Sequence, residues 1–454
     1  MQFLDTLFYF VITLGILVFV HELGHFLAAK LCGMRAQVFA LGMGYRLFGY
    51  NKVNGFSFWT LDQTVDLGNH TDYRVAAFPI GGYVKIEGMI DESFDTDFTG
   101  KPPQAWEFRA KPMWQRMIVI SAGVLMNILL AIFIFWGINY SQGRNIRDTT
   151  TIGYVVENSP AAKAGLVAGD KVLAINGDRI THWDMILNEI YITNTGRDLR
   201  FTVQRDGKDM DLFLPRTLLP EPTDVSFGII PEKTEVVIVS VEPNTPADKL
   251  GLKPDDVLLS LNGTPVKFNE KVVEIVKGSI GGTLSVEWQR GNETMSGVTS
   301  PTPEGRIGIG LETHYAGPVT KLHFTLVQAL PQGLKDIVNV TTLSFQQIWQ
   351  MVTGRIAFTK NIGGPIKIAQ IATQTAEHGV ITYLGFVALL SISLAILNIL
   401  PFPALDGGHL FFLVYEAIFR KEIPAKVKLT LQRAGVALLL VFMAFVLIND
   451  IINF

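Results

Sequence analysis

Residues 21–25 read His-Glu-Leu-Gly-His, and they interrupt an apolar stretch that runs from about residue 7 to about residue 29. On a helix, positions i and i+4 share one face. His21 and His25 can therefore bind one zinc ion, with Glu22 beside them as the general base. Ionisable side chains at bilayer depth cost roughly 2.5–3.5 kcal/mol each on insertion scales. The alternative is a surface helix with two spare histidines, but the apolar setting favours a metal-hydrolase site inside a membrane.

The composition of this 454-residue chain lies between that of a soluble enzyme and that of a pure bundle of membrane helices. Hydrophobic residues make up 48% and charged residues 17%, with a mean hydropathy of +0.31. Membrane spans combined with soluble domains are therefore expected. The net charge of −3 gives no indication of nucleic-acid binding. The single cysteine, Cys32, excludes an internal disulfide framework and a cysteine-based zinc site.

Four stretches are apolar enough to span, or nearly span, a bilayer. They lie at about residues 4–31, 117–140, 381–402 and 436–452. The first lacks the basic segment and small-residue cleavage site of a signal peptide, so we expect it to be retained. The sequence predicts a polytopic α-helical membrane protein with four transmembrane helices, within residues 1–33, 113–140, 379–407 and 431–454. A cytoplasmic loop at 408–430 would join the last two.

Basic residues near the span ends predict the orientation of the chain. They gather in the loop after the first span and in the loop after the third, whereas neither terminus has a lysine or arginine close to it. Both loops should then be cytoplasmic, and both termini and the long central segment should be extracytoplasmic. The basic residues concerned are Lys30, Arg35, Lys111, Arg116, Arg420, Lys421, Lys426, Lys428 and Arg433.

The central segment contains an internal repeat. Residues 159–166 (SPAAKAGL) match residues 245–252 (TPADKLGL) at an offset of 86 residues, and an Asn-Gly pair follows each copy. In each copy the pattern predicts a short helix, then a strand, then a tight turn. The two copies resemble tandem PDZ domains, at 150–218 and 226–312, which bind extended peptides by strand addition. The alternative is that the pair only spaces or shields the site.

Two further regions have their own patterns. Residues 34–112 alternate apolar, β-branched and aromatic residues with glycines, which predicts a hairpin-rich, membrane-associated sheet on the cytoplasmic side. Residues 315–378 show amphipathic helical patterning. Helices there would lie on or near the outer membrane surface, or alternatively would form a packed cap on the repeats.

A third zinc ligand is needed, because catalytic zinc sites use three protein ligands and an open position. Asp406 follows the third apolar stretch, in the segment Asn398-Ile-Leu-Pro-Phe-Pro-Ala-Leu-Asp406-Gly-Gly. The predicted orientation places Asp406 and His21 at compatible depths in the cytoplasmic half of the bilayer. Pro401 and Pro403 must interrupt regular helix just before the aspartate. A turn that merely ends a helix would be the alternative without the His21 motif.

These motifs together resemble the site-2 protease family of intramembrane zinc metalloproteases, in its bacterial regulator of sigma-E protease branch. The resemblance rests on H-E-x-x-H in the first span, N-x-x-P-x-P-x-L-D-G in the third, and the repeats between the second and third, and it covers nearly the whole chain. It implies that His21, His25 and Asp406 bind one zinc ion and that Glu22 is the catalytic base.

The resemblance also implies where substrate binds. The segment S-A-G-V-L-M-N in the second span matches a glycine-to-asparagine motif that lines the site, with Val124 where a proline is usual. Ser393 stands where relatives have a second asparagine. Gly42 and Gly44 match a membrane-reentrant β element. The substrate-binding residues implied are Asn398, Pro401, Pro403, Gly123, Asn127, Gly42 and Gly44.

The activity implied is cleavage of single-span membrane proteins that another protease has already shortened outside. Anti-sigma factors and remnant signal peptides form the substrate class, with the PDZ domains excluding large ectodomains. The setting would be the bacterial inner membrane and regulated proteolysis in envelope stress signalling. Two other classes compete. A zinc transporter or sensor would need ionisable residues along several spans, and a catalytically silent binding protein would not need an intact His21, Glu22, His25 and Asp406.

Overall fold

The apolar stretch around the His21 motif forms one helix, α1 (Gln2–Leu31), in the computed structural model. The structure describes residues 2–59, 67–89, 100–194, 197–218, 227–354 and 362–452. Within those ranges, four helices are long and apolar enough to cross a membrane. They are Leu4–Leu31 of α1, α2 (Met113–Gln142), α10 (Val380–Ile399) and α12 (Ala425–Ile452).

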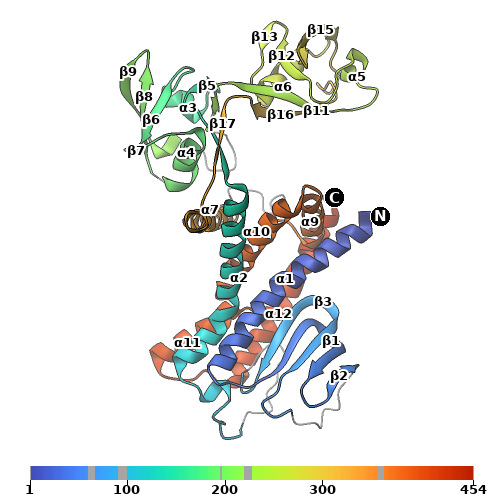
Figure 1. Ribbon diagram of the computed structural model, residues 1–454, viewed down its shortest axis with the longest axis vertical. Coiled ribbons are helices and arrows are strands. Elements are labelled where there is room, and N and C mark those ends of the chain that lie inside the picture. The colour runs from blue at the N-terminus through green and yellow to red at the C-terminus, as the bar shows by residue number, and fades with distance from the viewer. Residues whose placement is uncertain are drawn as a thin grey trace. The chain divides into compact units, whose positions relative to one another are not determined.

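The chain divides into two units, of which the first comprises residues 1–143 and 323–454. This helical unit also contains α7 (Leu326–Val352), α9 (Pro365–Glu377), α11 (Asp406–Phe419) and a 3-10 turn at Phe108–Ala110. Buried side chains of α1, α2 and α10 form one apolar core, which includes Leu17, Ala131 and Ile392. Both chain termini lie at the same end of this unit (Figure 1).

The region after the third apolar stretch differs from the expectation. The helix ends at Ile399 and not at residue 407, since Pro401 and Pro403 cannot donate to a continuing helix. Residues 408–430 are not a simple loop, because α11 begins at Asp406 and continues to Phe419. The last helix begins at Ala425, directly after Pro424, and not at residue 431. Its basic first turns extend the helix beyond the apolar part.

The amphipathic region forms two helices, as its pattern predicts. A capping box at Thr325 and Gln328 starts α7. Trp136 of α2 donates its indole N–H to the carbonyl of Leu326, and Asn139 donates to Asp336 at 2.7 Å. These contacts, like the division of the chain, place α7 within the helical unit.

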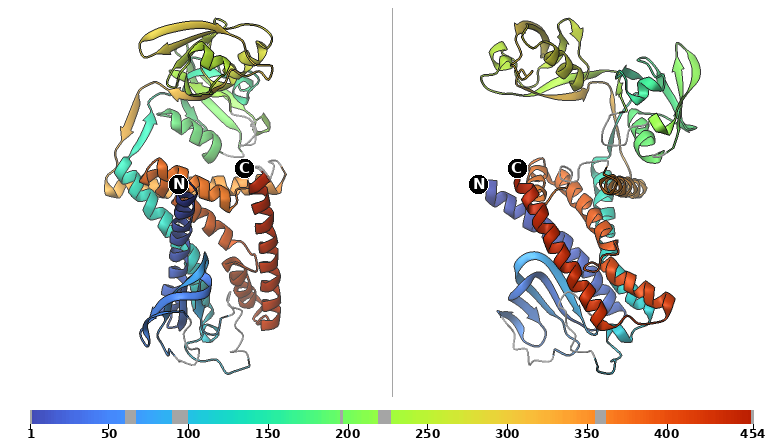
Figure 2. Two further views of the ribbon diagram at one scale, coloured as in Figure 1. Left: turned by 90° about the vertical axis from the view of Figure 1, so that its right-hand side faces the viewer. Right: turned by 180° about the vertical axis from the view of Figure 1, so that it is seen from behind.

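Three strands of the same unit form an antiparallel sheet in the order β2-β1-β3. They are β1 (Ala36–Asn51), β2 (Gly55–Phe58) and β3 (Asp72–Ile86). Val38 pairs with Lys85 and also with Asp72, so the first half of β1 lies between two parts of β3. The sheet lies beside the end of α1 that is farther from the N-terminus (Figures 1 and 2).

The second unit, residues 144–322, contains the two repeats. In each, the Ser/Thr-Pro-Ala cluster starts a short helix, and Asn-Gly turns with positive φ follow the next strand. The predicted helix, strand and turn are therefore confirmed. In the first repeat they are α3 (Pro160–Lys163), β6 (Lys171–Ile175) and residues 176–177; in the second they are α5 (Pro246–Leu250), β12 (Val257–Leu261) and residues 262–263.

The remaining elements of each repeat follow the same order. The first continues with β7 (Asp178–Arg179), α4 (Trp183–Asn188), a π-helical turn (Glu189–Thr193), β8 (Leu199–Arg205), β9 (Lys208–Leu214) and a 3-10 turn (Arg216–Leu218). The second begins with β11 (Thr234–Val241) and continues with β13 (Thr264–Pro265), α6 (Asn269–Gly278), β14 (Leu284–Arg290), β15 (Glu293–Thr299) and β16 (Ile309–Tyr315).

Each repeat has its own apolar core, centred on Trp183 in the first and Trp288 in the second. The first core extends past the expected limit at residue 218, because Phe227 and Ile229 belong to it. The reason is strand pairing, since β10 (Ile229–Pro231) pairs with β5 (Ile152–Val155). Two strands at the ends of the unit, β4 (Arg144–Arg147) and β17 (Val319–Leu322), also pair with each other.

Candidate metal centre

Three ligand-type side chains converge where α1 meets the start of α11. Nε2 of His21 lies 3.1 Å from Oδ2 of Asp406, and Nε2 of His25 lies 3.3 Å from the same oxygen. The two Nε2 atoms are 3.2 Å apart. The structure therefore brings together the two histidines and the aspartate, which lies 381 positions after His25 and 385 after His21, as the sequence predicts.

The chemistry of these atoms fits a zinc ion. Oδ2 of Asp406 is buried and has no hydrogen-bond partner in the described part of the chain. Two imidazole nitrogens and one carboxylate oxygen are all electron-pair donors, so their close approach needs a shared cation or protons. Two nitrogens and one oxygen form a ligand set that is usual for catalytic zinc.

Local sequence explains how Asp406 reaches this point. It occupies the first turn of α11, directly after the interruption at Pro401 and Pro403. A Cβ on Gly407 would collide with the carbonyl oxygen of Leu400, and a Cβ on Gly408 would collide with that of Phe402. Both glycines therefore allow the start of α11 to pack against the chain that leads into it.

Helix α2 orients both imidazole rings. Nδ1 of His25 lies 2.8 Å from the carbonyl oxygen of Val119, and Nδ1 of His21 lies 3.2 Å from the amide nitrogen of Asn127. The helices approach closely because Gly24 of α1 faces Ala122 and Gly123 of α2 faces the rings. Small residues are typical of such helix contacts in membranes.

Glu22 lines the same small cavity as the three ligand-type residues. The cavity has a volume of about 50 Å³ and is lined by residues of α1, β3, α2 and α11, among them Glu22, Tyr83, Val84 and His409. Glu22 is 8% exposed, and a Cβ on Gly82 of β3 would lie 3.0 Å from its Cγ. The side chain of Glu22 thus lies between its own helix and β3.

The other predicted site residues lie at different distances from this cavity. Asn398 reaches His21, with 3.4 Å between its Nδ2 and Nε2. Pro401, Pro403, Gly42 and Gly44 are not among the residues that line the cavity.

Gly42 and Gly44 lie within β1 with φ of +85° and +87°. Val124 is a buried residue of α2, and the hydroxyl of Ser393 donates to the carbonyl of Leu389 in its own helix.

The family of this protein follows from comparison with known proteins. The model of peptidase family M50 matches residues 9–442. The chain belongs to peptidase family M50. It is 31% identical to the regulator of sigma-E protease RseP of Escherichia coli, over 99% of both chains. It is 30% identical to the regulator of sigma E protease of Haemophilus influenzae, over the full length of both.

A protein of Pasteurella multocida, whose name describes it as a zinc metalloprotease, is 31% identical over the full length of both chains. The predicted resemblance to site-2 proteases is therefore confirmed. This M50 peptidase is a zinc metalloprotease of the site-2 type and a multi-pass protein of the inner membrane. It functions as an intramembrane protease.

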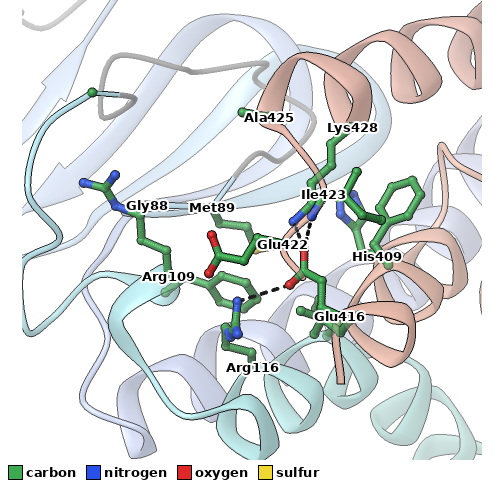
Figure 3. Close-up of a pocket in the computed structure, with 15 residues that line it drawn as sticks. Gly88, Met89, Arg109, Arg116, His409, Glu416, Glu422, Ile423, Ala425 and Lys428 are labelled. Atoms are coloured by element: carbon green, nitrogen blue, oxygen red, sulfur yellow. Dashed lines mark hydrogen bonds and ion pairs between the residues drawn. The ribbon is translucent and has the colours of Figure 1, made fainter. Parts of the chain in front are cut away.

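A larger cavity, of about 310 Å³, adjoins the metal centre of this M50 peptidase. Met89 and His409 line both cavities. Figure 3 shows the larger one, where Glu416 of α11 forms ion pairs with Lys428 of α12, at 2.5 Å, and with Arg116 of α2, at 3.7 Å. Charged side chains therefore join three helices beside the site.

Several residues at the centre are not identifiable from the sequence. Val119 contributes only a backbone carbonyl, and any residue type could do so. Gly82 and Tyr83 lie in a strand whose pairing is formed by distant segments. His409 belongs to the same turn as Asp406, and its position three residues after a predicted ligand was the one available signal.

Proposed function

We propose that this M50 peptidase cleaves the transmembrane segments of single-span proteins after their outer domains have been removed. The observation that carries the proposal is the convergence of His21, His25 and Asp406 beside Glu22, within helices long enough to cross a membrane. His21, His25 and Asp406 would hold one zinc ion per chain. When bound, zinc polarises a carbonyl and lowers the pKa of a water ligand to about 7.

Glu22 is the catalytic base in this proposal. It removes a proton from the water that attacks the scissile carbonyl carbon, and it delivers that proton to the nitrogen of the breaking C–N bond. The products are one new carboxylate and one new amine. Asn398, beside Nε2 of His21, is placed to hold the substrate carbonyl or backbone near the reacting atoms.

The substrate must be extended, because a helix hides its backbone groups in its own hydrogen bonds. Residues 82–84 of β3 lie against Glu22 or line its cavity. A substrate segment that adds to the sheet as a strand would have its peptide groups paired there. The roles of Gly42 and Gly44, which allow the positive φ values within β1, would then be to shape the sheet.

The two repeats act in this proposal as tandem PDZ domains that restrict access to short outer domains. Both termini and the repeats would be periplasmic, with the metal centre near the cytoplasmic side. The shared position of the termini at one end of the helical unit is consistent with four spans (Figure 1). Relatives named as regulators of sigma-E protease support a role in envelope stress signalling. Substrates would include an anti-sigma factor and remnant signal peptides.

The decisive test co-expresses a tagged single-span substrate with the wild type or with Glu22→Gln. The variant should bind zinc but leave the substrate intact, because only the proton acceptor is lost. A transporter would keep moving zinc in the Gln variant, and a silent binding protein would show no cleavage even in the wild type. Cleavage by Glu22→Gln at the wild-type rate would contradict the mechanism.

A further inference from the structure

His21 has an asparagine at each of its two ring nitrogens. Asn398 lies 3.4 Å from Nε2, the nitrogen that also faces His25 and Asp406. Asn127 lies 3.2 Å from Nδ1, which is on the other side of the ring. Asn127 is 0% exposed, so a substrate cannot reach it without displacing the packing around it. The two asparagines therefore have different roles.

The side-chain amide of Asn127 is hydrogen-bonded through only one of its two polar atoms in the described part of the chain. Its amide nitrogen faces Nδ1 of His21, while its Oδ1 is buried and has no partner among the described residues. A half-turn of the amide exchanges these two atoms without moving the side chain otherwise. A histidine that binds a metal through Nε2 carries its proton on Nδ1. The turned amide thus gives that proton an acceptor and gives Oδ1 a donor.

We propose that Asn127 is a positioning residue for the metal centre. Its amide oxygen accepts the Nδ1 proton of His21 and fixes the ring with Nε2 toward Asp406. The carbonyl of Val119 does the same for His25, at 2.8 Å from its Nδ1. Both rings are thus oriented from α2. This role replaces the substrate contact expected of Asn127, and it rests on the proposed zinc ligation by His21.

A second contact fixes Asn127 itself. The hydroxyl of Ser391 on α10 donates to the backbone carbonyl of Asn127 at 2.8 Å, and both residues are fully buried. This bond holds the helix backbone and does not involve the amide of Asn127. It provides a matched control, because its loss disturbs packing at the same place without removing the acceptor for His21.

The test measures zinc affinity of the purified full-length protein, stripped of metal and titrated against a chromophoric chelator. Asn127→Leu keeps the size of the side chain but removes the oxygen, and zinc should bind about 10- to 100-fold more weakly. Asn127→Ala is the second variant that lacks the oxygen. Asn127→Asp keeps an acceptor and should restore affinity to within a few-fold of the wild type. Thermal unfolding of each metal-free variant establishes that it is folded.

Ser391→Ala should bind zinc nearly as tightly as the wild type. The absorption spectrum of the cobalt-loaded protein should change in Asn127→Leu, since the ring is no longer fixed, and remain unchanged in Ser391→Ala. Unchanged affinity in both Asn127→Leu and Asn127→Ala would overturn the proposal. So would a loss in Ser391→Ala equal to that in Asn127→Leu, or a folded Asn127→Asp without rescue.

One further variant separates this inference from the proposed function. His25→Ala removes a proposed ligand and should abolish tight zinc binding. If His25→Ala still binds zinc tightly, the proposed metal centre itself is wrong. If it loses zinc while the Asn127 variants retain wild-type affinity, only the positioning role of Asn127 is wrong.

Discussion

Gly123 of α2 faces His25 of α1 so closely that a Cβ at position 123 would collide with Nε2 of the imidazole. The same Cβ would lie 2.7 Å from Cε1 and 2.8 Å from Nε2 of His21. Real Cβ atoms are not found at such distances, so either the rings or the helix must shift. The metal centre thus depends on the absence of a side chain at this position.

Gly123→Ala should therefore impair metal binding and proteolysis together. A shift of the rings by about an ångström would misplace the proposed ligands, and geometry errors of that size cost about 100-fold in rate. Zinc content and cleavage of a tagged single-span substrate are the measurements. Gly137→Ala on the same helix is the control, because nothing lies within 4 Å of its Cβ position. Full activity in Gly123→Ala would show that the ring positions are not constrained by α2.

An ion pair between a partly exposed arginine and a buried aspartate recurs in both repeats, and the sequence alone does not predict it. Arg290 forms two hydrogen bonds with Asp256, each of 2.7 Å, and donates a third to the carbonyl of Gly251. Arg205 forms the same contacts with Asp170 and Gly165. The two aspartates are 86 residues apart, like the repeated segments, and their arginine partners come from later strands, β8 and β14.

Arg290→Met should destabilise the second repeat, because it leaves the side chain of Asp256, 1% exposed, without its partner. Hydrogen exchange resolved by peptide should show faster exchange in the second repeat alone. Arg205→Met should produce the matching effect in the first repeat. Equal exchange in wild type and variant would mean that each pair contributes nothing to its fold.

The same pair gives the second repeat a pH dependence. Burial raises the pKa of Asp256, but the hydrogen bonds and charge of Arg290, with the backbone N–H of Lys253, outweigh it and hold the pKa below its usual value. A carboxyl with a depressed pKa stabilises the fold above its unfolded value of about 3.9, and this stabilisation is lost as the pH falls through the folded pKa. Protection of the second repeat should thus decline below about pH 4, and less so in Asp256→Asn.

The proposed catalytic and metal-binding residues could be predicted because each has a chemical signature in the sequence. His21, Glu22 and His25 share one helical turn, and Asp406 follows an unusual double interruption by proline. The residues that orient them have no such signature. Val119 contacts His25 only through its backbone carbonyl. Asn127 reaches His21 because small residues on α1 and α2 allow these two helices to pack closely.

The long helices and parts of the repeats are the elements of the fold that the sequence predicts. Apolar length identified the four long helices, and the repeat identified one short helix, one strand and one turn in each half of the second unit. The helix that begins at Asp406 is not evident from the sequence, since its apolar residues follow two glycines and no side chain caps its first turn. The packing of Phe227 and Ile229 in the core of the first repeat depends on contacts between segments far apart in the sequence, which a local pattern does not show.

Glu416→Gln should lower the thermal stability of the detergent-solubilised protein. The side chain of Glu416 is 2% exposed, and it provides the negative charge between Lys428 and Arg116. The substitution leaves Lys428 and Arg116 without the carboxylate that pairs with both, and removing one partner of a buried pair costs about 3–5 kcal/mol. Glu422→Gln is the control, since Glu422 lines the same cavity but is exposed. Equal melting temperatures for the two variants would contradict this role of Glu416.

Asp450 near the end of α12 caps the start of α9. Its carboxylate accepts hydrogen bonds from the backbone N–H groups of Gly364 (2.9 Å), Ile366 (3.1 Å) and Lys367 (3.3 Å). Asp450→Ala leaves these groups without their acceptor, and losing a helix cap costs about 0.5–2 kcal/mol. Hydrogen exchange in α9 should therefore accelerate about 2- to 30-fold, whereas Ile451→Ala, at an exposed neighbour, should leave it unchanged.

Gly364→Ala should act like Asp450→Ala, because its Cβ would lie 2.5 Å from Oδ2 of Asp450. Wild-type exchange in both variants would show that α9 is held by its apolar contacts alone.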